Sequence, residues 1–168
     1  LHISKNEMEE MLSQVPNSTL VWVDETYIEF AGAAESLEQF AVETQNVIIC
    51  KSMRKVYAFS GVRDAYFCCS PHLIETLKSV TPPWAVSLPA QAAAIAALKD
   101  PEYYKEKYEE THVLRNNLKQ RLHGMGITEF ADGVANFLLF YLPKEFGEIG
   151  EFLNCCKQDN LFMRDVSN

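Results

Sequence analysis

Three short apolar runs constrain the fold of this chain more than any other feature. They are rich in β-branched and aromatic residues and occupy residues 20–23, 46–50 and 65–69. Uninterrupted apolar runs of this length are typical of strands covered on both faces, as in parallel sheets. Segments with helical spacing alternate with these runs, so the pattern predicts an α/β fold with a mostly parallel sheet.

Capping signals predict where the helices begin. Ser4 and Glu7 fit a capping box for a short first helix, and Ser70-Pro71 combines a cap with a first-turn proline. Pro82-Pro83 forbids helix and is interpreted as a linker. A helix is expected from Ser87 and a second one from Asp100-Pro101. The second helix carries a packing stripe, namely Tyr104, Tyr108, Leu114, Leu118 and Leu122.

The pattern changes after Gly124 and Gly126, which are expected to end that helix. Residues 135–142 are expected to form one long strand, followed by a helix bearing Phe146, Ile149, Phe152 and Leu153. We therefore expect part of a larger domain in residues 1–86, linking helices in 87–123, and part of a smaller α+β domain in 124–168. The chain begins with Leu1 and ends on polar residues, so we expect a piece of a longer polypeptide.

Composition disfavours several classes of protein. The net charge is −8 and the 15 lysines and arginines are scattered, so no basic face is expected to bind nucleic acid. No run approaches the roughly 20 apolar residues of a membrane helix, and the start does not resemble a signal peptide. The five cysteines include two adjacent pairs and are expected to be reduced thiols. These features predict a cytoplasmic enzyme.

Polar side chains follow the first two apolar runs. Asp24 and Tyr27 come after the first, and Ser52, Lys55 and Arg63 come after the second. A lysine can form a Schiff base with a carbonyl compound, and a hydroxyl with a guanidinium suits a phosphate monoester. Pyridoxal phosphate needs both, together with a carboxylate for its ring nitrogen and a donor for its phenolic oxygen. Asp24 and Tyr27 fit these last two roles.

The order and spacing of these motifs resemble the fold-type I pyridoxal-phosphate aminotransferases of class I/II. The motifs are Asp24-Glu25-Thr26-Tyr27, Ser52-Met53-Arg54-Lys55 and Gly61-Val62-Arg63. Within that family the chain is similar to the histidinol-phosphate aminotransferase branch, which also contains threonine-phosphate decarboxylases. The likeness continues through Pro83-Trp84, Ala90-Gln91, Asn136-Phe137 and Met163-Arg164-Asp165.

The resemblance implies a role for each residue. Lys55 is implied to hold the cofactor as a Schiff base and to shuttle the α-proton, and Asp24 to pair with the pyridine nitrogen. Tyr27 is implied to donate to the phenolic oxygen, and Ser52 and Arg63 to bind the phosphate. The implied reaction moves an amino group from an amino acid or amino phosphate to a 2-oxo acid. A homodimer is implied as well, and Trp84 and Asn136 fall where relatives line or support the substrate cleft.

Alternatives remain open. A decarboxylase of the threonine-phosphate type shares this core, and a third possibility is a non-catalytic module that keeps the fold. A serine acyltransferase with Ser52 as nucleophile is disfavoured, because neither Ser-Asp-Asn nor Lys-Thr-Gly occurs in the chain.

The chain also departs from the family pattern. Arg54 replaces a small or hydroxylated residue, and it could pair with the phosphate, reach solvent or signal altered activity. Asp64 follows Arg63 and could draw that arginine away from the phosphate. The segment that stacks on the cofactor ring and the arginine that clamps the substrate carboxylate are both missing from the chain.

Overall fold

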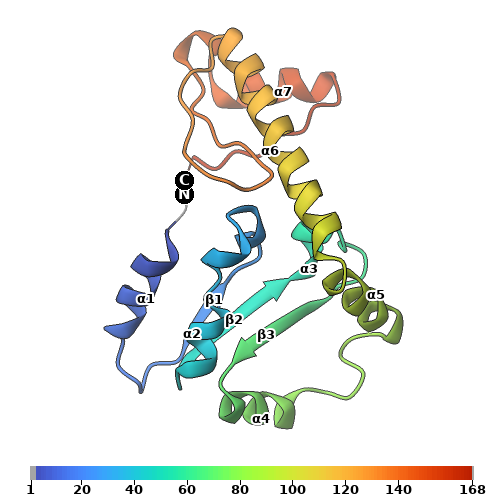
Figure 1. Ribbon diagram of the computed structural model, residues 1–168. Coiled ribbons are helices and arrows are strands. Elements are labelled where there is room, and N and C mark those ends of the chain that lie inside the picture. The colour runs from blue at the N-terminus through green and yellow to red at the C-terminus, as the bar shows by residue number, and fades with distance from the viewer. Residues whose placement is uncertain (1–2, 168) are drawn as a thin grey trace.

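The computed structural model describes residues 3–167 (Figure 1). Leu1, His2 and Asn168, the outermost residues of the two expected domain parts, lie outside the described residues. The elements in chain order are α1 Lys5–Ser13, β1 Val21–Asp24, η1 Ile28–Phe30, η2 Ala33–Glu35, α2 Glu38–Glu43, β2 Val47–Ser52, α3 Met53–Val56, β3 Ala65–Cys69, α4 Pro71–Val80, α5 Leu88–Leu98, α6 Pro101–Gly124, η3 Lys144–Phe146 and α7 Ile149–Gln158. The three strands and most of the helices form where the sequence predicts them.

The sheet of the described chain has the order β1-β2-β3. β1 and β2 are parallel, whereas β2 and β3 are antiparallel, so the α/β class is confirmed but the described strands are not mostly parallel. The connection explains the direction of β3. Residues 53–64 join the two strands, and their helix, α3, spans only Met53–Val56, which is too short to carry the chain back along the strand for a parallel return. The chain therefore turns and stays at one edge of the sheet.

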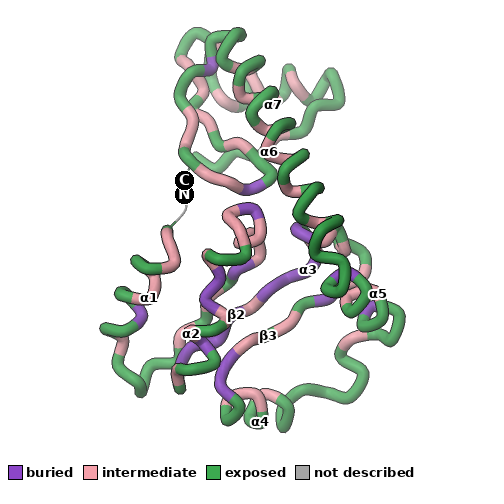
Figure 2. Tube along the Cα trace, viewed as in Figure 1, coloured by how far each residue is buried: buried purple, intermediate pink, exposed green. Residues whose placement is uncertain are grey.

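One face of the sheet carries the core. Val47 and Ile49 of β2 pack with Leu12 of α1 and with Leu37 and Ala41 beside and within α2. These five side chains are at most 8% exposed, and Figure 2 shows the buried segments concentrated along β2. Burial of these apolar side chains is the main stabilising contribution of this layer.

The opposite face of the sheet is open at its flanks. Trp22 of β1 is 54% exposed and Phe67 of β3 is 42% exposed, and their rings meet edge to face with centroids 4.9 Å apart. Side chains alternate between faces along a strand, so both rings point away from the core that Val23 and Cys68 contact. The prediction that the strands are covered on both faces is thus confirmed for β2 and is wrong for β1 and β3 within the described chain.

The capping predictions are confirmed in two of three places. Ser4 and Glu7 form the capping box of α1, and Asp100 accepts a hydrogen bond from the backbone N–H of Tyr103 at the start of α6. Ser70 stands at the N-cap of α4 with Pro71 in the first turn, but its hydroxyl makes no capping bond. That hydroxyl oxygen is buried without a hydrogen-bond partner among the described residues.

The packing stripe on α6 is confirmed only in its first half. The ring centroids of Tyr104 and Tyr57 lie 4.8 Å apart, and those of Tyr108 and Phe30 lie 5.1 Å apart. Leu114 and Leu118 are instead 61% and 50% exposed. Figure 1 shows why: α6 leaves the sheet and runs on toward α7.

The long strand expected over residues 135–142 is wrong. A single antiparallel bridge joins Phe130 and Phe140, and only the flanking N–H groups of Ala131 and Tyr141 add backbone hydrogen bonds. A strand needs a neighbour that pairs along its length, and here residues 129–131 are the only pairing segment. Beyond this segment Phe146 lies in η3 and the expected helix forms as α7.

Two further observations concern the described residues as a whole. All five cysteines are free, as expected. None of the described helices has the length and apolar character required to cross a membrane.

Candidate functional site

Strand register places three of the predicted residues at one edge of the sheet. Asp24 ends β1 opposite Cys50, and Ser52 ends β2 opposite Ala65, the first residue of β3. Arg63 lies two residues before Ala65. Since β1 and β2 end where β3 begins, Asp24, Ser52 and Arg63 are all delivered to the same edge.

Lys55 is held at this edge by a short helix. α3 begins directly after β2, with Ser52 as its N-cap accepting a long hydrogen bond of 3.5 Å from the backbone N–H of Arg54. Met53 anchors the helix, because its side chain is 1% exposed and its N–H donates to the carbonyl of Asp64 at 3.2 Å. Lys55 is exposed, and among residues 3–167 no ion pair engages its amine.

Arg63 occupies a strained backbone conformation. Its φ of 61° lies in the left-handed region, which is uncommon for a residue with a side chain. Asp64 is buried and accepts the N–H of Ala65 at 2.8 Å through its Oδ1. Within the described chain no ion pair joins Asp64 to Arg63, so the expected competition for that arginine is not seen.

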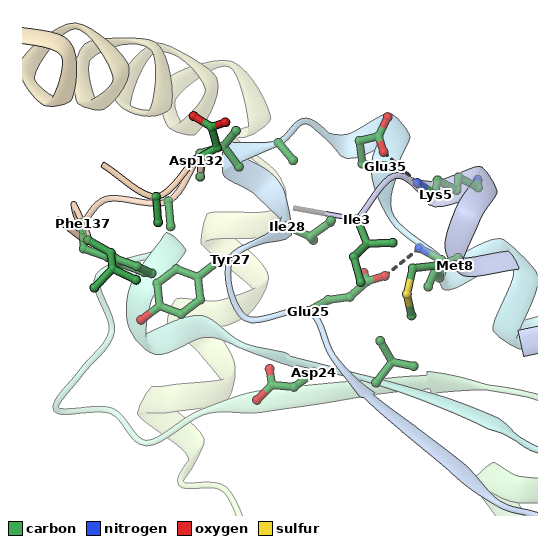
Figure 3. A pocket seen from close by; sticks show the side chains of 18 of the residues that line it. Ile3, Lys5, Met8, Asp24, Glu25, Tyr27, Ile28, Glu35, Asp132 and Phe137 are labelled. Atoms are coloured by element: carbon green, nitrogen blue, oxygen red, sulfur yellow. Dashed lines mark hydrogen bonds between the residues drawn. The ribbon is translucent and has the colours of Figure 1, made fainter. Parts of the chain in front are cut away.

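Asp24 and Tyr27 lie on the other side of the edge. Oδ1 of Asp24 accepts hydrogen bonds from the backbone N–H and the hydroxyl of Thr26, which fix the carboxylate. The ring of Tyr27 meets Phe137 edge to face at 5.5 Å. In Figure 3 the polar ends of Asp24 and Tyr27 point away from Ile3 and Met8.

A mostly apolar cavity of about 350 Å³ lies beside Asp24 and Tyr27. It is enclosed by α1, by the segment from Val23 to Leu37, and by residues 131–139 (Figure 3). Asp24 and Tyr27 line it, whereas Ser52, Lys55 and Arg63 do not. The five predicted residues therefore share the strand edge but not this cavity.

A network of ion pairs around Lys51 lies next to the edge of the sheet that carries the predicted site residues. Nζ of Lys51, in β2, lies 3.1 Å from Glu29, 3.4 Å from Glu38 and 3.6 Å from Glu25. Glu25 also accepts hydrogen bonds from the hydroxyl of Ser36 and from the backbone N–H of Leu37. The network thus ties the end of β1 and the start of α2 to β2.

The charges of this network shift its pKa values. Burial raises the pKa of Glu29 above its ordinary value, and the charge of Lys51 offsets only part of the rise. Burial acts to lower the pKa of Lys51, but the charges of Glu29 and Glu38 outweigh it, so that pKa is raised. The motif pattern does not predict this network. The signal that could have found it is the lysine at the end of an apolar strand.

The α/β architecture is accompanied by a match to one protein family, which defines the class of protein. The family model described as "Aminotransferase class I and II" matches residues 2–146, and the chain belongs to this family.

Individual proteins of this family match most of the chain. It is 33% identical over 146 residues to histidinol-phosphate aminotransferase 2 from Carboxydothermus hydrogenoformans, an alignment that covers 85% of this chain and 40% of that protein. The chain spans less than half the length of the curated relatives it matches.

Solved structures share the fold. A histidinol-phosphate aminotransferase from Sinorhizobium meliloti, in complex with pyridoxal-5'-phosphate, superimposes with a TM-score of 0.84 and 22% identity, covering 98% of this chain and 46% of that one. An L-threonine-O-3-phosphate decarboxylase from Porphyromonas gingivalis gives a TM-score of 0.76 and 22% identity, covering 99% and 50%. At these identities the likeness shows the fold alone.

Proposed function

We propose that this chain forms part of a pyridoxal-phosphate-dependent aminotransferase of the histidinol-phosphate type. The observation that carries the proposal is the strand register, because it delivers Asp24, Ser52 and Arg63 to one edge, and Lys55 lies in the short helix that begins directly after Ser52. Family membership supports the same reaction class.

The residues at this edge fit the chemistry of pyridoxal phosphate. Ser52 offers a hydroxyl and Arg63 a guanidinium for the phosphate, and Lys55 offers an exposed amine. Asp24 offers a carboxylate fixed by Thr26 for the ring nitrogen. When bound, the cofactor supplies the electron withdrawal that makes the α-proton of an amino acid acidic.

Each side chain then has a defined task. Nζ of Lys55 would hold the cofactor covalently until the amino group of the substrate displaces it, and the freed amine would then move the α-proton as general base and acid. Asp24 keeps a proton on the ring nitrogen, and Tyr27 donates a hydrogen bond to the phenolic oxygen. Ser52 and Arg63 hold the phosphate and so fix the ring relative to the lysine.

The substrates proposed are an amino acid or amino phosphate as donor and a 2-oxo acid as acceptor. Relatives named histidinol-phosphate aminotransferase support this pair. A decarboxylase is the second candidate, because one structural neighbour is an L-threonine-O-3-phosphate decarboxylase. Measuring glutamate formation against release of carbon dioxide from the full-length protein distinguishes the two reactions.

We also propose a domain arrangement and an assembly. Residues 1–86 belong to a larger cofactor-binding domain, 87–123 form the linking helices, and 124–168 belong to a smaller domain. The protein acts as a cytoplasmic homodimer. Gel filtration of the full-length protein tests the assembly, and a species of monomer size counts against it.

The central test is absorbance after addition of pyridoxal phosphate. The full-length protein is expected to develop the near-ultraviolet and visible band of a lysine-bound cofactor, and Lys55→Ala to lose it. Lys105→Ala, an exposed lysine of α6, is the matched control and keeps the band. A parent protein that stays colourless contradicts the proposal and favours a non-catalytic module.

A further inference from the structure

Three cations gather beside the end of β2 without carboxylate partners. Arg54 and Lys55 lie in α3, and Arg63 lies in the turn before β3. Across residues 3–167, no salt bridge joins any of them to an acid. The adjacent acid, Asp64, commits Oδ1 to the backbone N–H of Ala65. These three cations therefore have no salt-bridge partner within the described residues, and such a group favours a bound anion.

Arg54 is folded back toward Ser52 instead of extending into solvent. Its Nε donates a hydrogen bond of 3.0 Å to Oγ of Ser52, and its side chain is half-buried. The described structure gives its two terminal nitrogens no hydrogen bond. A guanidinium is a planar fork of five donors that matches phosphate oxygens, so two nitrogens remain for an anion while the third contacts Ser52.

The charge of Arg54 acts on the thiol of Cys50, which lies next to Asp24 in the sheet. Burial raises the pKa of the Cys50 thiol, the charge of Asp24 raises it further, and the charge of Arg54 opposes both. Cys50 pairs with Asp24 in the register of β1 and β2. Arg54 and Asp24 therefore both act electrostatically on Cys50.

We propose that Arg54 is a second arginine ligand of the cofactor phosphate, positioned by its hydrogen bond to Ser52. The chain then binds the phosphate dianion with two guanidinium groups, those of Arg54 and Arg63, together with the Ser52 hydroxyl. This inference rests on the proposed function, because the phosphate belongs to pyridoxal phosphate. It gives a binding role to the position at which the chain departs from the pattern of its relatives.

The test compares the equilibrium binding of pyridoxal phosphate with that of pyridoxal, which lacks the phosphate. Arg54→Gln in the full-length protein is expected to weaken binding of pyridoxal phosphate roughly 10- to 100-fold and to leave pyridoxal binding unchanged. Arg54→Lys keeps the charge but loses the fork and is expected to be intermediate. Arg121→Gln, at an exposed arginine of α6, is the matched control and binds both compounds as the parent does.

Three outcomes would overturn the inference while leaving the proposed function intact. In the first, Arg54→Gln binds pyridoxal phosphate as tightly as the parent does, and in the second it binds more tightly, as expected if Arg54 obstructs the site. In the third, it loses as much affinity for pyridoxal as for pyridoxal phosphate. A parent that binds neither compound overturns the proposed function and this inference together. Far-UV circular dichroism checks the fold of each variant, and if Arg54→Gln misfolds, parent-like binding by Arg54→Lys overturns the inference.

Discussion

At the scale of single residues, Arg63 combines a proposed function with a conformational cost. A left-handed backbone at a residue with a side chain costs about 1–2 kcal/mol, and the surrounding structure must compensate. The strain coincides with a proposed phosphate ligand. This coincidence indicates that binding, and not stability, sets the residue type at this position.

Replacing Arg63 by glycine is expected to separate stability from binding. Arg63→Gly should raise the free energy of unfolding of the full-length protein by about 1 kcal/mol, because glycine adopts a positive φ without strain. It should also weaken binding of pyridoxal phosphate by about tenfold or more. Urea denaturation without cofactor and a binding titration measure the two effects. Arg63→Lys keeps the strain and should lose affinity with no gain in stability, so a stabilised lysine variant refutes this reasoning.

Glu29 makes stability depend on pH. Since burial raises its pKa, the folded protein binds this proton more tightly than the unfolded protein does. The stability that protonated Glu29 contributes is therefore fully present below the pKa that this residue has in the unfolded protein. It is lost as the pH rises through its raised pKa in the folded protein. Glu29→Gln, which does not titrate, should gain stability relative to the parent as the pH rises from below the ordinary pKa of a glutamate to above its raised folded value. Urea midpoints at each pH test this, with Glu109→Gln, at an exposed position of α6, as the control substitution.

At the scale of elements, β2 connects the hydrophobic core to the proposed site. Its first residues fill the core, Lys51 binds three glutamates, and Ser52 caps the helix that carries Lys55. The position of Lys55, which we propose as the reactive lysine, is thus linked through β2 to the ion pairs of Lys51. A substitution in the Lys51 network is therefore expected to change both the free energy of unfolding and the affinity for pyridoxal phosphate.

Removing the ammonium of Lys51 is expected to be costly. Lys51→Met leaves Glu25 and Glu29 buried without their cation and should lower the free energy of unfolding by about 3–5 kcal/mol. Chemical denaturation of the full-length protein measures the loss. Lys78→Met breaks the exposed pair with Glu75 and should change stability little. If the two variants lose equal stability, the network is not the source of the effect.

The elements also show what can be read from sequence. The runs ending at Val23, Cys50 and Cys69 are local signals, and all three form strands. Residues 135–142 carry the same local signal, but pairing depends on a neighbour that no local pattern reveals. The direction of β3 and the partners of Lys51 depend likewise on residues distant in the chain. The shared edge could be predicted from strand ends, whereas the contact between Arg54 and Ser52 required coordinates.

At the scale of the whole molecule, one face of the described sheet is covered and the opposite face is open at its flanks. Trp22 and Phe67 place an aromatic pair on the open face. Contiguous exposed apolar surface is a site of association or aggregation.

The 168-residue chain expressed alone is expected to bind a hydrophobic dye such as anilinonaphthalene sulfonate through this face. The double variant Trp22→Thr and Phe67→Thr should reduce the fluorescence enhancement substantially, because threonine keeps strand propensity while removing the aromatic surface. Val113→Thr, which removes an exposed apolar side chain of α6, is the control. An unchanged signal in the double variant places the dye elsewhere.

The central position of β2 also predicts where the protein is slowest to open. Its backbone is paired on both sides, whereas within the described sheet β1 and β3 are each paired on one side only. Amide hydrogens of β2 should therefore exchange with solvent deuterium far more slowly than outward-facing amides of β1 and β3. Lys55 follows this strand by three residues. The most reactive proposed side chain is thus attached to the segment that we expect to fluctuate least.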